Sequence, residues 1–301
     1  MSAPQEAIER AWQEVDRRSD LLLEVSHRIF ERPELCFEER HAHDLLCDVL
    51  EREGLSPQRS AYGLDTAFAA EAGEGGAVVA VLCEYDALPD IGHACGHNVI
   101  AAAGLGAGLA AAALAEELGG TVRILGTPAE EGGGGKVFML REGAFDGVDA
   151  AVMVHPADHD LPTMRTLAIQ RLRATFHGQA SHAASAPHLG RNALDAAVLG
   201  YVNVAALRQH ILPDERVHGV FVDGGDKPNI VPSRTTMEWY VRSPTTSGLG
   251  ALTERVSDCL RAGATASGCT VELELVEPAY AELHDDPALL AVGEADGAAG
   301  A

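Results

Sequence analysis

The spacing of apolar and polar positions divides the chain into a helical start, several short strands and a later region in which strands and helices alternate. Over residues 4–53 apolar side chains recur at helical spacing, and a proline separates two predicted helices. Residues 78–83 form an apolar run with the length of a strand that is covered on both faces. Residues 66–70, 121–126 and 150–154 indicate further strands, so this half of the chain is predicted to be an α/β domain.

One predicted helix is apolar almost throughout. Residues 98–118 are long enough to cross a bilayer and carry almost no charge. The segment is built from alanine and glycine rather than leucine, isoleucine and phenylalanine, so its transfer free energy per residue is weak, and a cluster of ionisable residues directly precedes it. We therefore expect a close-packed helix buried behind the site rather than a membrane span.

Ionisable side chains follow the ends of three predicted strands. After the first come Glu84, Asp86, His93, Cys95 and His97, after the second Glu130 and Glu131, and after the third His155. In open α/β sheets, ligands collect just past the carboxyl ends of the strands. Any one of these residues alone is more often a buried or solvated side chain. Their presence at three successive strand ends favours a metal site.

A run of glycines separates the two acids from Lys136. A phosphate-binding loop would need glycine six places before this lysine and serine or threonine after it, but Glu130 and Val137 occupy those positions. We interpret the glycines as letting the backbone pass close to an ion or a substrate. Of two adjacent acids, one can bind metal while its neighbour accepts a proton.

The composition excludes two classes of partner. A formal net charge of −23 would repel nucleic-acid backbones and anionic membranes alike. An acidic substrate would need a local basic group. The six cysteines lack a small-scaffold spacing and the N-terminus has no apolar signal segment, so we expect a cytoplasmic protein with reduced thiols.

Four stretches of this chain, EYDALP, IGHACGHN, PAEEGGGG and MVHP, resemble the amidohydrolase branch of the aminoacylase and glutamate-carboxypeptidase metallopeptidases. This is peptidase family M20, and the most similar members are aminobenzoyl-glutamate hydrolase-like and dipeptidase-like. The resemblance extends from the first helices to about residue 285. It implies a zinc-peptidase-like catalytic domain with a central, mostly parallel sheet over residues 1–165, to which residues 277–301 would return as a stub.

The resemblance also implies a chemistry, the hydrolysis of an amide that joins an acyl or aminoacyl group to an amino acid. Two divalent metal ions would take part, with zinc favoured by thiolate and imidazole ligands and manganese, cobalt or nickel as alternatives. The implied ligand set is Cys95, as the bridge between the ions, together with His97, Glu131 and His155. Glu130 would be the general base for a metal-bridging water, and Asp86 would orient a ligand.

After His155 the pattern becomes strand, helix, strand, strand, helix, strand, the order of a split β-α-β fold. The resemblance implies that residues 166–276 form an inserted, ferredoxin-like α+β lid that also provides a homodimer surface. HGQASHAASAP and KPNIVP resemble motifs of that lid, so His182 would contact the scissile carbonyl or its oxyanion. Asn229 and Arg242 are candidates for holding the carboxylate of a small amide substrate, although a strand-face ion pair explains Arg242 equally well.

The end of the chain departs from the family pattern. The family supplies a further metal-binding histidine from a segment well after the lid, and here only residues 277–301 follow the lid. His284 lies where the chain has just left the lid, and we do not assign it that role. We expect the sheet to lack one or more strands, and the chain to be a fragment, the product of a shifted reading frame or a protein incomplete by nature.

Two other functions stay open. In the first, the chain is a non-catalytic remnant that binds metal or dimerises through the lid. In the second, Cys95 is the nucleophile of a thiol hydrolase and His93 or His97 is its base. Chelator treatment separates these alternatives from a metallohydrolase, because a thiol enzyme keeps its activity without metal and a remnant has none to lose.

Overall fold

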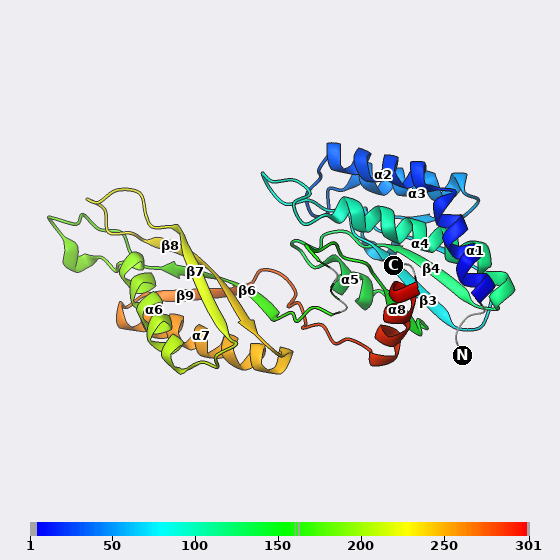
Figure 1. The fold of residues 1–301 in the computed structure, drawn as a ribbon. Helices are drawn as coiled ribbons and strands as arrows, with labels where there is room; N and C mark the ends of the chain where they lie inside the picture. Colours follow the sequence, from blue (N-terminus) through cyan, green and yellow to red (C-terminus); the bar gives the residue numbers. More distant parts are fainter. Residues whose placement is uncertain (1–4, 160, 162, 300–301) are drawn as a thin grey trace. The chain divides into compact units, whose positions relative to one another are not determined.

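The structure, a computed structural model, describes residues 5–159, 161 and 163–299 (Figure 1). The chain divides into two compact units, residues 1–160 and 161–301. Each unit has its own hydrophobic core. The return of residues 277–301 to the first domain stays a prediction.

The first unit is a five-stranded sheet with helices on both faces. Its strands are β1 Gln58–Arg59, β2 Phe68–Ala72, β3 Val78–Cys83, β4 Thr121–Gly126 and β5 Ala150–Val152, in the order β1-β2-β4-β3-β5. Its helices are α1 Gln5–Asp16, α2 Ser19–Glu31, α3 Arg40–Arg52, α4 His97–Leu118 and α5 Gly135–Arg141, with a short 3-10 turn at Ala61–Gly63. The α/β prediction is confirmed. The sheet is mixed, because β3, β4 and β5 run parallel whereas β2 runs antiparallel to both of its neighbours, β1 and β4.

The parallel strands end at one edge of this sheet. Cys83 at the end of β3 is in register with Gly126 at the end of β4, and Val81 is in register with Val152 at the end of β5. The segments that follow these strands therefore leave the sheet side by side. This register places the ionisable residues of the three strand ends within reach of one another.

The helical start differs from the prediction in one respect. Two helices, α1 and α2, stand where one was expected before the proline. The break falls at Arg18, whose side chain turns inward and is only 8% exposed. Its guanidinium binds Glu14 and, at 2.8 Å, Glu53 beyond α3. Two carboxylates thus compensate the buried charge of Arg18. The spacing of apolar residues cannot predict this break, because it depends on charged side chains.

Helix α4 lies against α1 and α2 on one side and against β3 and β4 on the other (Figure 1). It has the length and hydropathy of a membrane span, yet 61% of its most apolar window is buried within the protein. Its glycines allow the close packing. A Cβ atom on Gly104 would lie 2.4 Å from the carbonyl oxygen of Leu82, and one on Gly108 would lie 2.6 Å from the side chain of Ile124. The prediction of a close-packed helix behind the site is confirmed.

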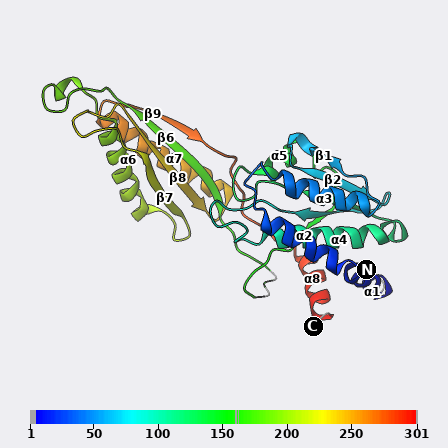
Figure 2. The ribbon, with the colours of Figure 1, turned by 90° about the horizontal axis from the view of Figure 1, so that it is seen from above.

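The second unit is a four-stranded antiparallel sheet in the order β7-β8-β6-β9. The elements in chain order are β6 Ala168–His177, α6 Ala193–Leu207, β7 Arg216–Asp223, β8 Arg234–Ser243, α7 Thr246–Ala266, β9 Thr270–Leu275 and α8 Pro287–Ala299, with 3-10 turns at Pro187–Leu189 and Arg208–His210. Helices α6 and α7 pack side by side on one face, over Phe176 and Trp239 (Figure 2). The predicted order of strands and helices over residues 166–276 is confirmed, and the action of this unit as a lid stays a prediction.

Alanine in place of Gly104 is expected to destabilise the protein, although alanine is the better helix former. The new Cβ would clash with a backbone oxygen of β3, which the hydrogen bonds of the sheet hold in place. Overpacking of this kind lowers the free energy of unfolding by about 1–3 kcal/mol. The gain in helix propensity is only about 1 kcal/mol. Gly250 in α7 has no heavy atom within 4 Å of the added Cβ, so Gly250→Ala is expected to stabilise. Urea unfolding of both variants checks this, and equal stabilisation by both would contradict close packing of α4.

Candidate metal centre

His97, the first residue of α4, lies at the centre of the strand-end cluster and is completely buried. Its Nδ1 lies 3.0 Å from Asp86 Oδ1, whereas its Nε2 has no hydrogen-bond partner among the described residues. Three carboxylate oxygens surround this Nε2, at 3.4 Å from Glu84, 3.6 Å from Glu130 and 3.8 Å from Glu131. Oxygens of Glu84 and Glu131 are themselves buried without a partner among these residues. Several polar atoms thus face one another without hydrogen bonds.

The spacing of these atoms matches ligands around an ion. Bonds of about 2.0–2.2 Å to a tetrahedral zinc ion place two nitrogen or oxygen ligands about 3.4 Å apart. The shortest of the three distances from His97 Nε2 has that value, 3.4 Å to Glu84. All three are longer than an ordinary N–H···O hydrogen bond. The donor set therefore fits a divalent cation.

A second donor group overlaps the first. Cys95 Sγ lies 3.5 Å from His155 Nε2, and zinc bonds of about 2.3 Å to sulfur and 2.0 Å to nitrogen give a similar separation of about 3.5 Å. His155 Nδ1 lies 2.8 Å from the carbonyl oxygen of Pro156, so Nδ1 donates its proton there and Nε2 keeps a lone pair for a metal. The ligand atoms of Cys95, His97 and His155 all lie within 4.8 Å of one another.

His97 therefore belongs to both donor groups. The second contains Glu84, His97 and Glu130, again within 4.8 Å. Four of the predicted residues, Cys95, His97, His155 and Glu130, are brought together in these groups, and Glu131 lies beside them at the distance already given. Glu84 received no role from the sequence. Its signal was its position immediately after the first strand, two residues before Asp86.

Burial and neighbouring charges shift the pKa values of three residues in this cluster. Burial, followed by the charge of Glu131 beside it, raises the pKa of the Cys95 thiol to about 12. Burial lowers the pKa of His97, but Asp86 and the charge of Glu84 outweigh it and raise the pKa to about 9. Hydrogen bonds from His97 and from the backbone of Glu131 lower the pKa of Asp86 against the effect of burial. In the absence of a metal Cys95 and His97 therefore retain protons that a bound cation would replace, whereas Asp86 stays a carboxylate.

His182 lies in the second unit, in the loop after β6, and its side chain is exposed. Its Nδ1 accepts hydrogen bonds from the backbone N–H groups of Ala184, at 3.3 Å, and Ser185, at 3.1 Å. Nδ1 is therefore unprotonated and Nε2 carries the proton. The backbone carbonyl of Asn229 accepts the N–H of Ala183 at 3.0 Å, so the two predicted motifs of this unit are adjacent. The loop presents an N–H donor on His182.

Arg242, on β8, makes no ion pair within the described part of the chain. Its guanidinium lies over the ring of Tyr240, 5.9 Å from the centroid. Its Nε is buried and has no hydrogen-bond acceptor among the described residues. The alternative of a strand-face ion pair therefore finds no support, and the guanidinium is available to an anion.

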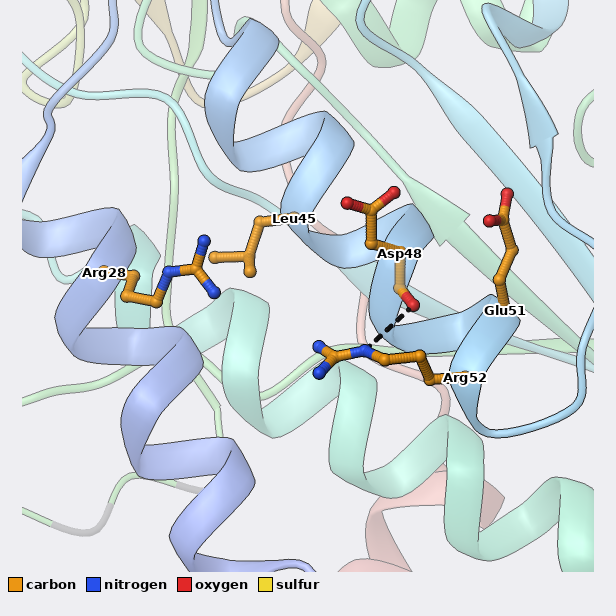
Figure 3. A pocket seen from close by; sticks show the side chains of 5 residues that line it. All are labelled: Arg28, Leu45, Asp48, Glu51 and Arg52. Carbon is orange, nitrogen blue, oxygen red and sulfur yellow. Dashed lines mark hydrogen bonds between the residues drawn. The ribbon is translucent and has the colours of Figure 1, made fainter.

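A hollow of about 510 Å³ lies away from this cluster, between α2 and α3 (Figure 3). Its lining residues are Arg28, Leu45, Asp48, Glu51 and Arg52. The four charged side chains are exposed, and Arg52 donates to the carbonyl oxygen of Asp48 on its own helix at 3.3 Å. None of the metal-site candidates lines it, and we assign it no chemistry.

The sequence of this chain is similar to a family of known proteins. Residues 80–298 match the model of peptidase family M20/M25/M40. The chain is 42% identical over 290 residues to the Xaa-Arg dipeptidase of Mus musculus, covering 92% of this chain and 66% of that protein. It is 37% identical over 270 residues to one of the subunits of the p-aminobenzoyl-glutamate hydrolase of Escherichia coli (strain K12), covering 83% and 56%. The chain thus spans less than two thirds of the length of these relatives.

Solved structures show the same fold. The aminobenzoyl-glutamate utilization protein of Klebsiella pneumoniae superposes with a TM-score of 0.75 at 20% identity, over 94% of this chain and 81% of that one. A dinuclear metal-binding M20 peptidase of Bacillus subtilis gives a TM-score of 0.69 at 24% identity, over 93% and 80%.

Proposed function

Because the chain belongs to peptidase family M20/M25/M40, we propose that it is a metal-dependent amidohydrolase that cleaves N-acyl amino acids or dipeptide-like substrates. The observation that carries the proposal is the pair of donor groups that share His97. Two donor groups that share one residue suit two neighbouring divalent ions. Zinc is the favoured metal because it prefers thiolate and imidazole ligands, and manganese, cobalt and nickel are alternatives. The B. subtilis structure, described as dinuclear, supports the count of two.

The residues divide the chemistry among them. Cys95, His97, Glu131 and His155 would hold the ions, and Asp86 fixes the ring of His97 through Nδ1. Ions bound there would polarise the scissile carbonyl and acidify a nearby water. Glu130 accepts the proton of the attacking water and passes it to the leaving nitrogen. The Nε2–H group of His182 donates to the carbonyl oxygen as it gains negative charge.

The substrate is proposed to carry a carboxylate. The two relatives are named for Xaa-Arg dipeptides and for p-aminobenzoyl-glutamate, and in both of these compounds an amide joins an amino acid. Arg242, with no ion pair among the described residues, supplies the local basic group that such an anion needs. Asn229 would add a hydrogen bond from the loop beside His182.

We also propose that the second unit, as lid, mediates a homodimer in the cytoplasm. Strand β7 is an edge strand. Three of its apolar side chains are exposed, as are three on one face of α6: Val220, Phe221 and Val222, and Val198, Leu199 and Val202. An exposed apolar edge of this kind favours pairing with a second chain. The six cysteines are scattered without the spacing of a small disulfide scaffold, which supports a reducing compartment.

The thiol-hydrolase alternative is the less favoured one. A thiol nucleophile needs a lowered pKa, whereas burial and the neighbouring Glu131 raise that of Cys95 to about 12. A metal ion would displace the same proton and make the thiolate a ligand instead.

The test measures metal content by elemental analysis and hydrolysis of a panel of N-acyl amino acids and dipeptides. We expect bound divalent metal, hydrolysis that a chelator abolishes, and a lower metal content in Cys95→Ala because the bridging thiolate is lost. Hydrolysis that survives complete removal of metal would support the thiol alternative. Bound metal without hydrolysis of any substrate would support the non-catalytic one, and unchanged metal in Cys95→Ala would contradict the bridging role.

A further inference from the structure

Glu84, which is buried, forms an ion pair with the partly exposed Lys136 beside the metal-site candidates. Glu84 directly follows β3, and its side chain is 2% exposed. One of its carboxylate oxygens binds the Nζ atom of Lys136. The other has no hydrogen-bond partner among the described residues and lies 3.4 Å from His97 Nε2. The carboxylate is thus anchored on one side and open toward His97 on the other.

The glycine run explains how Lys136 reaches this position. Gly133 and Gly134 have φ angles of 88° and 76°, which strain any residue with a side chain. A Cβ atom on Gly135 would lie 1.9 Å from the carbonyl oxygen of Pro128. The turn therefore folds tightly against the segment that follows β4, and Lys136, the second residue of α5, binds Glu84. The glycines thus let this turn pack against neighbouring backbone, and the expected approach of the turn to an ion or a substrate stays a prediction.

The choice of lysine is itself informative. Only two of the 22 lysine and arginine side chains are lysines, Lys136 and Lys227. An ammonium group is a compact charge that binds one carboxylate oxygen, whereas a guanidinium fork tends to occupy both. Lysine at this position therefore leaves the second oxygen of Glu84 free to face His97.

We propose that Glu84, held by Lys136, is a further protein donor to the ion that His97 binds. The proposal rests on the metal-binding part of the proposed function. The 3.4 Å between Glu84 and His97 Nε2 is the spacing of two ligands on one ion, and both atoms are buried and unpartnered among the described residues. Lys136 acts through Glu84 as a positioning residue, and it offsets one of the negative charges that crowd around His97.

A purely structural role for Glu84 makes the opposite prediction. In that case its second oxygen accepts a proton from a doubly protonated His97, and the carboxylate contributes nothing to metal affinity. Removing the charge of Glu84 would then leave metal binding unchanged or strengthen it, because His97 would hold less firmly the proton that competes with the metal ion for its Nε2.

The experiment measures zinc affinity of the 301-residue chain by competition with a chromophoric chelator. Glu84→Gln is expected to weaken binding by roughly 10- to 100-fold. Lys136→Met and Lys136→Arg are both expected to weaken it, the second because a guanidinium engages both oxygens. In the double variant Glu84→Gln/Lys136→Met the loss should be no larger than in Glu84→Gln alone, since the lysine acts through the glutamate.

Two control variants test for general damage. Glu71→Gln removes a carboxylate that pairs with Arg123 across β2 and β4, and Lys227→Met removes the other lysine, which is exposed. Both are expected to bind zinc as the unmodified chain does. Binding by Glu84→Gln as tight as that of the unmodified chain would overturn the inference. If Glu84→Gln did not fold, unchanged affinity in Lys136→Met would overturn it instead. Absence of zinc binding in the unmodified chain would contradict the proposed function itself.

Discussion

Glutamine in place of Glu130 is expected to leave metal binding intact and to slow amide hydrolysis by about 10²- to 10⁴-fold. The side chain of Glu130 is 37% exposed and that of Glu131 is 17% exposed, so Glu130 is the member of this adjacent pair that an attacking water reaches more easily. Burial and the charge of Glu84 raise the pKa of Glu130, which favours accepting a proton. Glutamine keeps the shape of the side chain and removes the proton acceptor. Steady-state kinetics and elemental analysis of the same preparation measure both quantities.

Glu131→Gln is the matched control, since it makes the same change one residue away. It is expected to lower the metal content, because Glu131 is the proposed ligand and its Oε1 is buried without a partner among the described residues. Distance alone, however, groups Glu130 with Glu84 and His97. The two variants decide between these assignments. If Glu130→Gln lost metal and Glu131→Gln kept it, Glu130 would be the metal ligand and Glu131 the general base.

The sheet and its polar edge were predictable from local pattern. The strands expected at residues 78–83 and 121–126 coincide with β3 and β4, because short apolar runs between turns leave little choice of boundary. Parallel strands then bring their carboxyl ends to one edge, which explains why Cys95, Glu130 and His155 all lie near His97 although Cys95 and His155 are 60 positions apart.

The remaining features depend on contacts that no local pattern encodes. The direction of β2, antiparallel to β4, is set by the sheet it joins and not by its own five residues. Lys136 reaches Glu84 across 52 positions because glycine removes side chains at three successive places in the turn. From the sequence those glycines indicated only a close approach of the backbone to an ion or a substrate, so the role now proposed for Glu84 could not be inferred. The break at Arg18 likewise follows from two distant carboxylates.

Replacing His182 is expected to lower kcat by about 10²- to 10³-fold, the cost of losing one donor to a developing oxyanion. The two ring nitrogens of His182 make different interactions, and different substitutions test each of them. Nδ1 accepts the N–H groups of Ala184 and Ser185 and shapes the loop, whereas Nε2–H is the proposed donor to the substrate. His182→Asn places an acceptor near Nδ1 and lacks the donor, and His182→Gln places a donor near Nε2. We therefore expect His182→Asn to be as impaired as His182→Ala, and His182→Gln to retain part of the rate with KM little changed.

The opposite order, with His182→Asn active and His182→Gln inactive, would show that the loop shape matters and that the side chain does not contact the substrate.

Mixing two variant chains tests whether His182 acts in the active site of its own chain or in that of a partner, because the proposed lid also forms the proposed dimer surface. His182→Ala and Glu130→Gln chains are each expected to be impaired alone. If His182 acts in the partner's site, a mixed dimer contains one site with both residues intact, and part of the activity returns. Exchange of chains without recovery of activity would assign His182 to the site of its own chain or remove it from the chemistry.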